Sequence, residues 1–185
     1  MFALIALAVS LGSPIPAAGW VTALDGTRHR PLVEEKGKTL ALVFITHDCP
    51  ICNAYAPELR RIADSYAKKG ASVELVYAEP NLTLAEAKSH AKAYSYTGLK
   101  TFLDPTAILA KASGVTVTPE AAVYGANGSL LYRGRIDDQY VAFGKQRARV
   151  TSHDLRIALD AALRHHPLAH PRTEAVGCFI PLTRS

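Results

Sequence analysis

The chain has 185 residues and a mass of 19.9 kDa, which favours a single domain and argues against a second full one. Hydrophobic residues make up 49% of the chain and charged residues 20%, so it can bury a core and is not a disordered protein. The net charge of +5 is scattered rather than gathered in one basic block, which argues against a nucleic-acid partner.

The chain begins with the apolar stretch MFALIALAVSL and carries no charged side chain before Asp25. The stretch is too short to span a bilayer, which needs about 20 apolar residues, and glycine and prolines follow it as in a cleavage region. We therefore predict a signal peptide over residues 1–19, export to the periplasm or the extracellular space, and no stable membrane span after processing. Because no Lys or Arg precedes the apolar stretch, a buried first strand or helix is the alternative.

The next segments predict a hairpin, a strand and a helix. Residues 20–34 alternate around an Asp-Gly turn and predict a β-hairpin. The continuous apolar run TLALVFI at 39–45 is typical of a central strand that is covered on both faces. Apolar residues recur every three to four positions over 52–69, which predicts an amphipathic helix that ends before a glycine.

The remaining chain continues this alternation and then departs from it. We expect, in chain order, a strand at 72–77, helices at 84–94 and 107–112, and the two strands of an antiparallel hairpin at 120–124 and 129–133. A last helix, capped by Thr151 or Ser152, ends near Arg164, and a proline-containing tail follows it.

Two of the three cysteines, Cys49 and Cys52, follow the predicted central strand as a Cys-x-x-Cys motif. If the helix begins at Pro50, Cys49 lies at the helix cap, where free backbone N–H groups and the helix dipole favour a thiolate. Cys52 lies one turn further along, close enough to form a disulfide with Cys49. The alternative is that both cysteines merely pack at the start of the helix.

The histidines predict no metal site. His165, His166 and His170 cluster near the end of the chain and are interpreted as a solvated helix end. The other histidines considered are interpreted as surface or cap-adjacent residues: His29, His90 and His153.

The order of elements, the Cys49-Pro-Ile-Cys52 motif, Pro57 and the Thr118-Pro119 pair before a strand together resemble the redoxin branch of the thioredoxin-like superfamily. The resemblance covers about residues 20–163. It implies an α/β thioredoxin fold with a central mixed sheet of four to five strands, flanked by helices, and an N-terminal β-hairpin. The domain is expected over 20–165, with a C-terminal tail, 166–185, that docks on it.

The resemblance also implies an activity, thiol-disulfide oxidoreduction without a cofactor. Cys49 is expected to attack as the nucleophile and Cys52 to resolve the mixed disulfide. Pro119 is expected to be a cis-proline facing the cysteines, and the backbone of Thr118 to pair with the incoming chain. The expected partners are disulfide- or dithiol-containing proteins and an unknown redox partner.

Several positions depart from the thioredoxin pattern. Asp48 stands where a Trp is common, and the strand at 40–45 lacks the buried acid that deprotonates the resolving cysteine. His47, when protonated, would place a positive charge near the sulfur. Pro57 is interpreted as a helix kink, and Glu58 either assists proton transfer or lies on a solvated helix face, which is the preferred interpretation.

Two alternative functions stay open. The segment Thr46-His-Asp-Cys49 resembles the Thr-x-x-Cys half of the peroxiredoxin pattern, although Leu42 stands where that pattern has a proline. A thiol peroxidase of this kind would use Thr46 to hold the peroxide and Arg133 or Arg135 to keep Cys49 ionised. A copper(I)-binding module would use the paired thiolates as soft ligands.

Cys178 lies in a short apolar patch of the otherwise charged tail, which suggests that the tail docks on the domain. Three interpretations compete. The residue is a buried core thiol, a second resolving partner for Cys49 or Cys52, or a cysteine that bonds to another chain.

Overall fold

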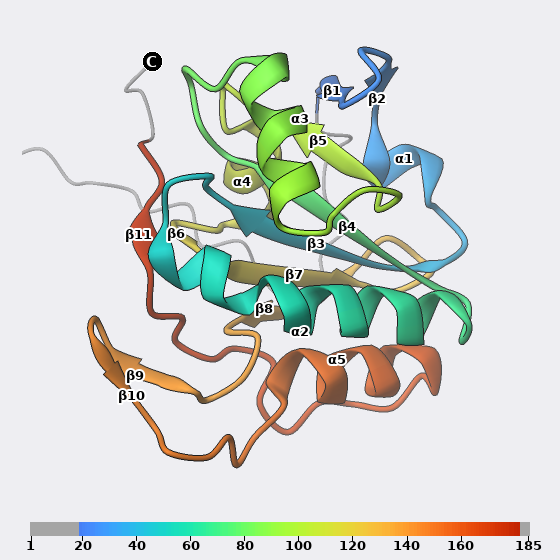
Figure 1. The fold of residues 1–185 in the computed structure, drawn as a ribbon. Helices are drawn as coiled ribbons and strands as arrows, with labels where there is room; N and C mark the ends of the chain where they lie inside the picture. Colours follow the sequence, from blue (N-terminus) through green and yellow to red (C-terminus); the bar gives the residue numbers. More distant parts are fainter. Residues whose placement is uncertain (1–18, 182–185) are drawn as a thin grey trace, which may run out of the picture.

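A computed structural model describes residues 19–181 of the chain (Figure 1). The strands are β1 (Val21–Ala23), β2 (Arg28–His29), β3 (Thr39–Ile45), β4 (Ala71–Tyr77), β5 (Thr101–Leu103), β6 (Val117–Thr118), β7 (Glu120–Tyr124), β8 (Leu130–Gly134), β9 (Tyr140–Ala142), β10 (Lys145–Gln146) and β11 (Cys178–Phe179). The helices are α1 (Pro31–Glu34), α2 (Pro50–Ala67), α3 (Leu84–Ala93), α4 (Ile108–Ser113) and α5 (Asp154–Leu163).

The main sheet has seven strands in the order β2-β1-β5-β4-β3-β7-β8. Strands β3, β4 and β5 run parallel to one another, and β7, β8 and the β1–β2 hairpin join antiparallel. The predicted mixed α/β fold is therefore confirmed. Five strands form its centre, and the N-terminal hairpin extends it to seven because β1 pairs with β5, a strand that the sequence did not predict.

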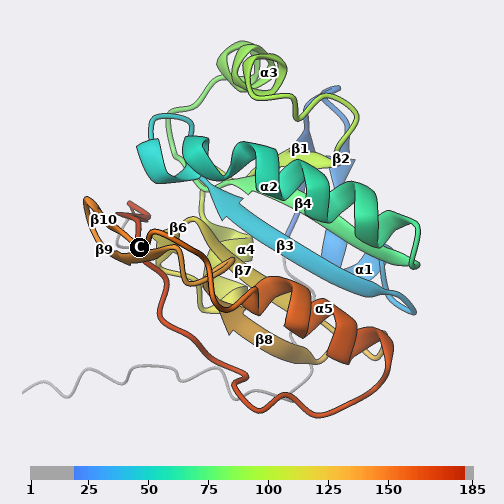
Figure 2. The ribbon, with the colours of Figure 1, turned by 60° about the horizontal axis from the view of Figure 1, so that its bottom comes forward.

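Both faces of the sheet are covered, and strand β3 contributes to a core on each face (Figure 2). Ala41, Val43 and Ile45 pack in the core that α2, α3 and α5 cover. The alternate residues Leu40, Leu42 and Phe44 pack in a second core with α4 and the N-terminal hairpin. This division follows from the two-residue period of a strand, and it explains why all seven residues of β3 are buried.

Several helix boundaries differ by a few residues from the sequence-based expectation. Helix α2 begins at Pro50, two residues before the periodic pattern but as the proposed cap position of Cys49 requires, since proline suits the first helical position. The N-cap of α5 is His153, not Thr151 or Ser152, because the Thr151 hydroxyl donates to the Asp138 carboxylate instead. The end of the predicted first hairpin, 31–34, forms the short helix α1.

The C-terminal tail lies along the domain and contacts it at two places. The Arg133 amide of β8 donates to the Pro171 carbonyl at 3.0 Å, and the Thr173 amide donates to the Arg133 carbonyl at 3.2 Å. Gly134 makes this approach possible, because a Cβ there would collide with Thr173. The tail then reaches β6, with which β11 pairs antiparallel.

The predicted signal peptide, 1–19, lies almost entirely outside the described residues. Within residues 19–181, no helix has both the length and the apolar character that a bilayer crossing needs.

Candidate active site

Cys49 is the N-cap of α2 and has no exposed surface. Its neighbours hold its sulfur as an anion: hydrogen bonds from the Cys52 and Cys178 side chains and from the backbone amides of Cys52 and Ile51 lower the pKa of Cys49 to about 5, against the opposing effect of burial. The largest of these effects comes from the Cys52 thiol. The sequence assigned this role to the helix end, whose Cys52 and Ile51 amides do donate to the sulfur, and the two neighbouring thiols add to their effect.

Cys52 lies one turn into α2 and is buried. Removal from water, followed by the hydrogen bond to the Cys49 thiolate and the charge of that thiolate, raises the pKa of Cys52 well above its ordinary value. Cys52 is therefore a protonated thiol beside a thiolate, which is the arrangement that a resolving cysteine needs before the first exchange.

The Thr118–Pro119 peptide bond, which faces the cysteines, is cis, as the resemblance implied. The Thr118 carbonyl oxygen lies 3.5 Å from the Cys49 sulfur and accepts a hydrogen bond when that sulfur carries a proton. The Thr118 hydroxyl lies 3.1 Å from that of Thr46, and both residues are buried. The structure thus brings Thr46, the two cysteines and the Thr118-Pro119 pair to one place.

Cys178 joins this site from the far end of the chain. Its sulfur lies 2.8 Å from the Cys49 sulfur, to which its thiol donates a hydrogen bond. Burial and the neighbouring Cys49 thiolate raise the pKa of Cys178 to about 12. The three cysteines are free thiols in the structure, and they form one cluster.

His47 is paired with Glu79, a residue that the sequence analysis did not single out. The Glu79 carboxylate accepts from the His47 amide at 2.6 Å and lies 2.7 Å from Nδ1 of the same histidine. This hydrogen bond raises the pKa of His47, although partial burial opposes it. Glu79 follows β4 as His47 follows β3, and the carboxyl ends of parallel strands meet at one edge, so the topology carried a signal for this contact.

The ligand atoms of His47, Asp48 and Glu79 lie within 4.8 Å of one another, so these side chains are the described group best arranged to hold a cation. The Asp48 side chain is exposed, and the His47 and Glu79 side chains already satisfy each other. The ion pair accounts for the contact between His47 and Glu79.

The structure does not bring the predicted auxiliary charges to Cys49. Arg133 contacts Glu120 at 3.4 Å and the Gly114 carbonyl, and Arg135 contacts Asp154 at 2.8 Å. Neither arginine is therefore available to stabilise the thiolate, contrary to the peroxidase expectation.

Glu58 is neither a proton carrier at the cysteines nor part of a solvated helix face. Its carboxylate lies 2.8 Å from Arg61 in the same helix and 2.8 Å from Arg156 in α5. The side chain is 19% exposed. Glu58 therefore links helix α2 to helix α5.

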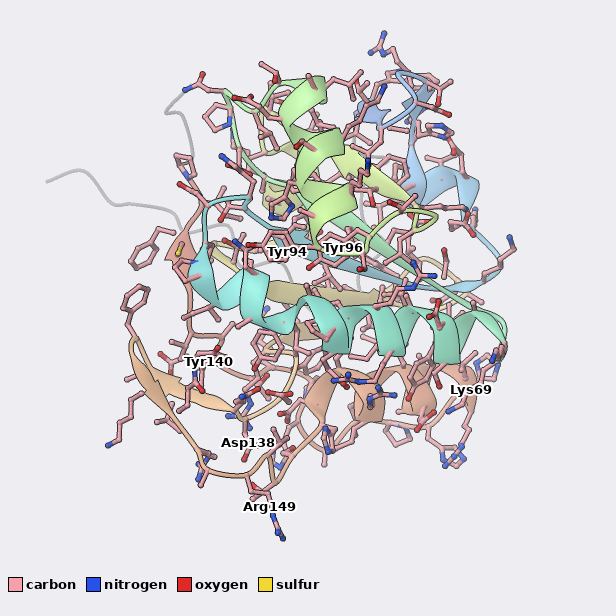
Figure 3. The ribbon with its side chains drawn as sticks, in the orientation of Figure 1. Lys69, Tyr94, Tyr96, Asp138, Tyr140 and Arg149 are labelled. Carbon is pink, nitrogen blue, oxygen red and sulfur yellow. The ribbon has the colours of Figure 1, made fainter. Side chains whose placement is uncertain are left out.

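The expectation for His90 is wrong, because this histidine is half-buried between α3 and the sheet. Its Nδ1 lies 2.7 Å from the Tyr77 hydroxyl and its Nε2 lies 2.9 Å from Oδ1 of Asn53, whose amide donates to the His47 carbonyl. Burial lowers the pKa of His90, and the charge of His47 lowers it further. The rings of Tyr94 and Tyr96, which are labelled in Figure 3, lie 4.4 and 6.1 Å from that of His90.

The remaining histidines lie away from the cysteines. His29 is partly exposed in β2 and pairs with Glu34 at 2.8 Å. The others are exposed, at the start of α5 or beyond its end: His153, His165, His166 and His170.

Comparisons with known proteins place this arrangement in a family. The model of the family described as Redoxin matches residues 10–142, which is most of the chain. No curated protein sequence matches the chain.

Many solved structures share the fold, including the following three. A hypothetical protein from Sinorhizobium meliloti 1021 is 27% identical, with a TM-score of 0.81 over 96% of this chain and 97% of its own. An uncharacterized conserved protein from Geobacillus kaustophilus is 26% identical, with a TM-score of 0.82 over 95% and 94%. The exposed lipoprotein thioredoxin Etrx1 from Streptococcus pneumoniae strain TIGR4 is 28% identical, with a TM-score of 0.55 over 63% and 87%.

The family match and the thioredoxin-like neighbours support a redox enzyme in general terms. With a thioredoxin fold and a cluster of thiols at the start of α2, the chain belongs to the Redoxin family.

Proposed function

We propose that this chain is an exported thiol-disulfide oxidoreductase that exchanges disulfides with protein partners through Cys49 and Cys52. The observation that carries the proposal is the Cys49 sulfur at the N-terminus of α2, with a pKa lowered to about 5 and the Cys52 thiol donating to it. A cysteine that is ionised at neutral pH is a far better nucleophile toward disulfides than an ordinary one.

In the proposed reaction the Cys49 thiolate attacks one sulfur of a partner disulfide, and the other partner sulfur leaves with the electron pair of the broken bond. Cys52 then gives up its proton to the departing thiolate and attacks the Cys49 sulfur of the mixed disulfide. The bond between Cys49 and the partner breaks, and its electron pair leaves with the second partner sulfur, which takes up a proton from water. The partner thus leaves with two thiols, and the Cys49–Cys52 pair is oxidised. The same steps in reverse donate a disulfide to a dithiol partner.

The charge distribution favours the second direction. A low pKa at Cys49 stabilises the reduced, thiolate form of the pair, and a pair whose reduced form is stabilised is an oxidant. The proposed oxidoreductase therefore tends to give its disulfide to dithiol partners.

The surroundings of Cys49 suit a protein partner. Val141 and Phe143 at the β9–β10 hairpin and Phe179 in β11 are 41%, 69% and 83% exposed. These elements lie on the same side of the molecule as the N-terminal end of α2 in both ribbon views, and Tyr140 at the start of β9 marks this side in Figure 3. Exposed apolar side chains on the side of a reactive group are typical of a surface that meets another protein.

The alternative functions have less support in the geometry. A peroxidase would need the Thr46 hydroxyl to hold a peroxide, but that hydroxyl is paired with Thr118 in a buried position. Copper(I) would find soft ligands in the cysteine cluster, so a copper(I) titration of the reduced protein is the control for the metal-binding reading.

The test of the proposal uses a single variant, a double variant and a protein that contains disulfides. We expect Cys49→Ser to abolish exchange. The double variant Cys52→Ser with Cys178→Ser, which leaves no second thiol beside Cys49, should accumulate a mixed disulfide with the partner, seen as a band that disappears on reduction. Wild type that reacts faster with hydrogen peroxide than with dithiol or disulfide proteins would contradict the proposal and favour the peroxidase.

Export is part of the proposal and rests on the apolar first residues. We expect the chain expressed with its own N-terminus to be recovered outside the cytoplasm and to begin at Trp20, as N-terminal sequencing would determine. Recovery of the intact chain from the cytoplasm would contradict export.

A further inference from the structure

The structure poses a problem for the proposed reaction, because its nucleophile has no exposed surface. Strand β11 covers the sulfur: the Cys178 side chain lies against Cys49 at 2.8 Å. A partner that reaches Cys49 must therefore displace β11.

Strand β11 also occupies the edge on which an incoming chain would pair. In the antiparallel ladder Cys178 lies opposite Thr118, and Phe179 lies opposite Val117. The Thr118 hydroxyl donates to the Cys178 carbonyl at 3.4 Å, and the Ile180 amide donates to the Thr116 carbonyl at 3.0 Å. An extended segment on a strand edge with a cysteine against the nucleophile is the arrangement of a bound substrate.

We propose that residues 177–180 are a built-in substrate strand, and that Cys178 is a third redox thiol which exchanges disulfides with Cys49. The inference rests on the proposed function, because it gives Cys178 a role in the exchange at Cys49. It also defines the partner: an extended segment that pairs antiparallel with β6 and presents a cysteine opposite Thr118, in place of Cys178.

The exchange needs no outside oxidant or reductant. In the oxidised protein the Cys178 thiolate attacks the Cys49 sulfur of the Cys49–Cys52 disulfide. The Cys49–Cys178 bond forms, the Cys49–Cys52 bond breaks, and the electron pair leaves with Cys52, which takes up the proton that Cys178 has lost. One disulfide and one thiol are present before and after. A disulfide bond measures about 2.05 Å, so the Cys49 and Cys178 sulfurs have to approach by less than one ångström.

Two features hold the strand in this register. Gly177 passes so close to Thr118 that a Cβ at position 177 would collide with the Thr118 carbonyl oxygen. Ile180 is 5% exposed and packs in the core beneath α4, whereas its neighbour Phe179 faces solvent. The Ile180 side chain therefore anchors the strand, and Gly177 allows its close approach to Thr118.

The test follows the fate of Cys49 in the full-length Cys52→Ser variant after treatment with oxidised glutathione. Acid quenching, alkylation of the free thiols and mass spectrometry of the peptides identify the linked cysteines. We expect the Cys49–Cys178 disulfide to exceed the Cys49–glutathione adduct by more than about tenfold, because Cys178 is held beside Cys49.

Two further variants test the docking itself. Adding Gly177→Ala to Cys52→Ser keeps all remaining thiols but drives β11 off Thr118, so the glutathione adduct should become the main product. Adding Glu174→Ala, an exposed position in the same tail, should leave the Cys49–Cys178 disulfide predominant. Equal amounts of this disulfide in the two double variants would overturn the role given to the strand.

The remaining outcomes separate the inference from the proposed function. A stable glutathione adduct at Cys49 with Cys178 alkylated would sink the inference and leave Cys49 as the nucleophile. If neither the Cys49–Cys178 disulfide nor the glutathione adduct forms, both the inference and the proposed function are contradicted. If Gly177→Ala prevents folding, the oxidised wild type decides: a Cys49–Cys178 linkage beside Cys49–Cys52 supports the inference, and Cys49–Cys52 alone contradicts it.

Discussion

The cluster of three cysteine sulfurs carries one negative charge, and each thiol affects the ionisation of the others. The charge resides on Cys49, because two thiols and two backbone amides donate to it, while burial and the charge itself keep protons on Cys52 and Cys178. Any change to one thiol should therefore alter the titration of the others.

Replacing Cys178 should make Cys49 harder to ionise. We expect Cys178→Ala to raise the pKa of Cys49 relative to the same background with Cys178 present, because the variant removes one of the hydrogen bonds that stabilise the thiolate. The measurement is the rate of Cys49 alkylation by iodoacetamide as a function of pH in Cys52→Ser backgrounds, in which the midpoint reports the pKa and the plateau reports access. Cys178→Ser keeps a donor and should shift the midpoint less; equal midpoints in all three proteins would contradict the shared charge.

The sequence could predict those residues of this site that are close together in the chain or that belong to a known motif. Cys49 and Cys52 stand in one motif, and Thr118-Pro119 stands directly before a strand. The pairing of His47 with Glu79 spans 32 residues, and that of Cys49 with Cys178 spans 129. No local sequence pattern contains such contacts, because they depend on the order of the strands in the sheet and on where the C-terminal tail packs on the domain.

At the scale of elements, predictability follows the strength of the periodic signal. Strand β3 was identified because seven apolar or small residues in a row leave few alternatives. Strands β5 and β6 have three and two residues, which is too short for any period to appear. Their existence depends on the neighbours β4 and β11, with which they pair.

The contact between helices α2 and α5 can be tested at Glu58. We expect Glu58→Gln to lower the free energy of unfolding by about 1 kcal/mol, since it weakens the ion pair with Arg156 at a partly buried position. Urea unfolding checks the stability, and the rate of thiol exchange should stay at the wild-type value because Glu58 contacts none of the cysteines. A large loss of exchange with normal stability would restore Glu58 as a proton carrier.

The contact between helix α3 and the sheet should depend on pH through His90. Its pKa is lowered in the fold, so below the ordinary value of about 6.5 the unfolded chain binds the proton more readily, and stability falls as pH drops through the folded pKa. His47 has a raised pKa and acts oppositely: its contribution is present below about 6.5 and is lost as pH rises through the folded pKa.

We therefore expect His90→Gln to lose less stability than wild type between pH 7 and pH 5. Urea unfolding midpoints across that range measure the difference, and His153→Gln, at an exposed position, is the matched control. Parallel curves for wild type and His90→Gln would show that His90 does not titrate against folding.

For the molecule as a whole, the sheet topology and the C-terminal tail both bring residues to the edge of the sheet where Cys49 lies. The parallel strands β3 and β4 end at one edge, where they gather His47, Cys49 and Glu79, as open α/β sheets do at the carboxyl ends of their strands. The tail leaves α5 on one side of the sheet, runs along β8 and ends across β6 beside the same edge (Figure 1). The last described residues of the chain therefore cover Cys49, the proposed nucleophile.

The effect of this cover can be measured by loosening the anchor of the tail without touching its cysteine. Ile180→Ala should weaken the docking of β11 on β6 by about 2 kcal/mol, because a buried side chain is shortened. This free energy corresponds to an about 30-fold larger population of the state in which β11 has left β6. We expect exchange with a peptide disulfide and with oxidised glutathione to accelerate, because both must reach a sulfur that β11 covers. Glu174→Ala is the matched control, since that exposed side chain lies in the same tail but outside the β11–β6 pairing. If Ile180→Ala exchanged with the peptide no faster than Glu174→Ala, the tail would not be what limits entry, and the burial of Cys49 would have to be relieved by another movement.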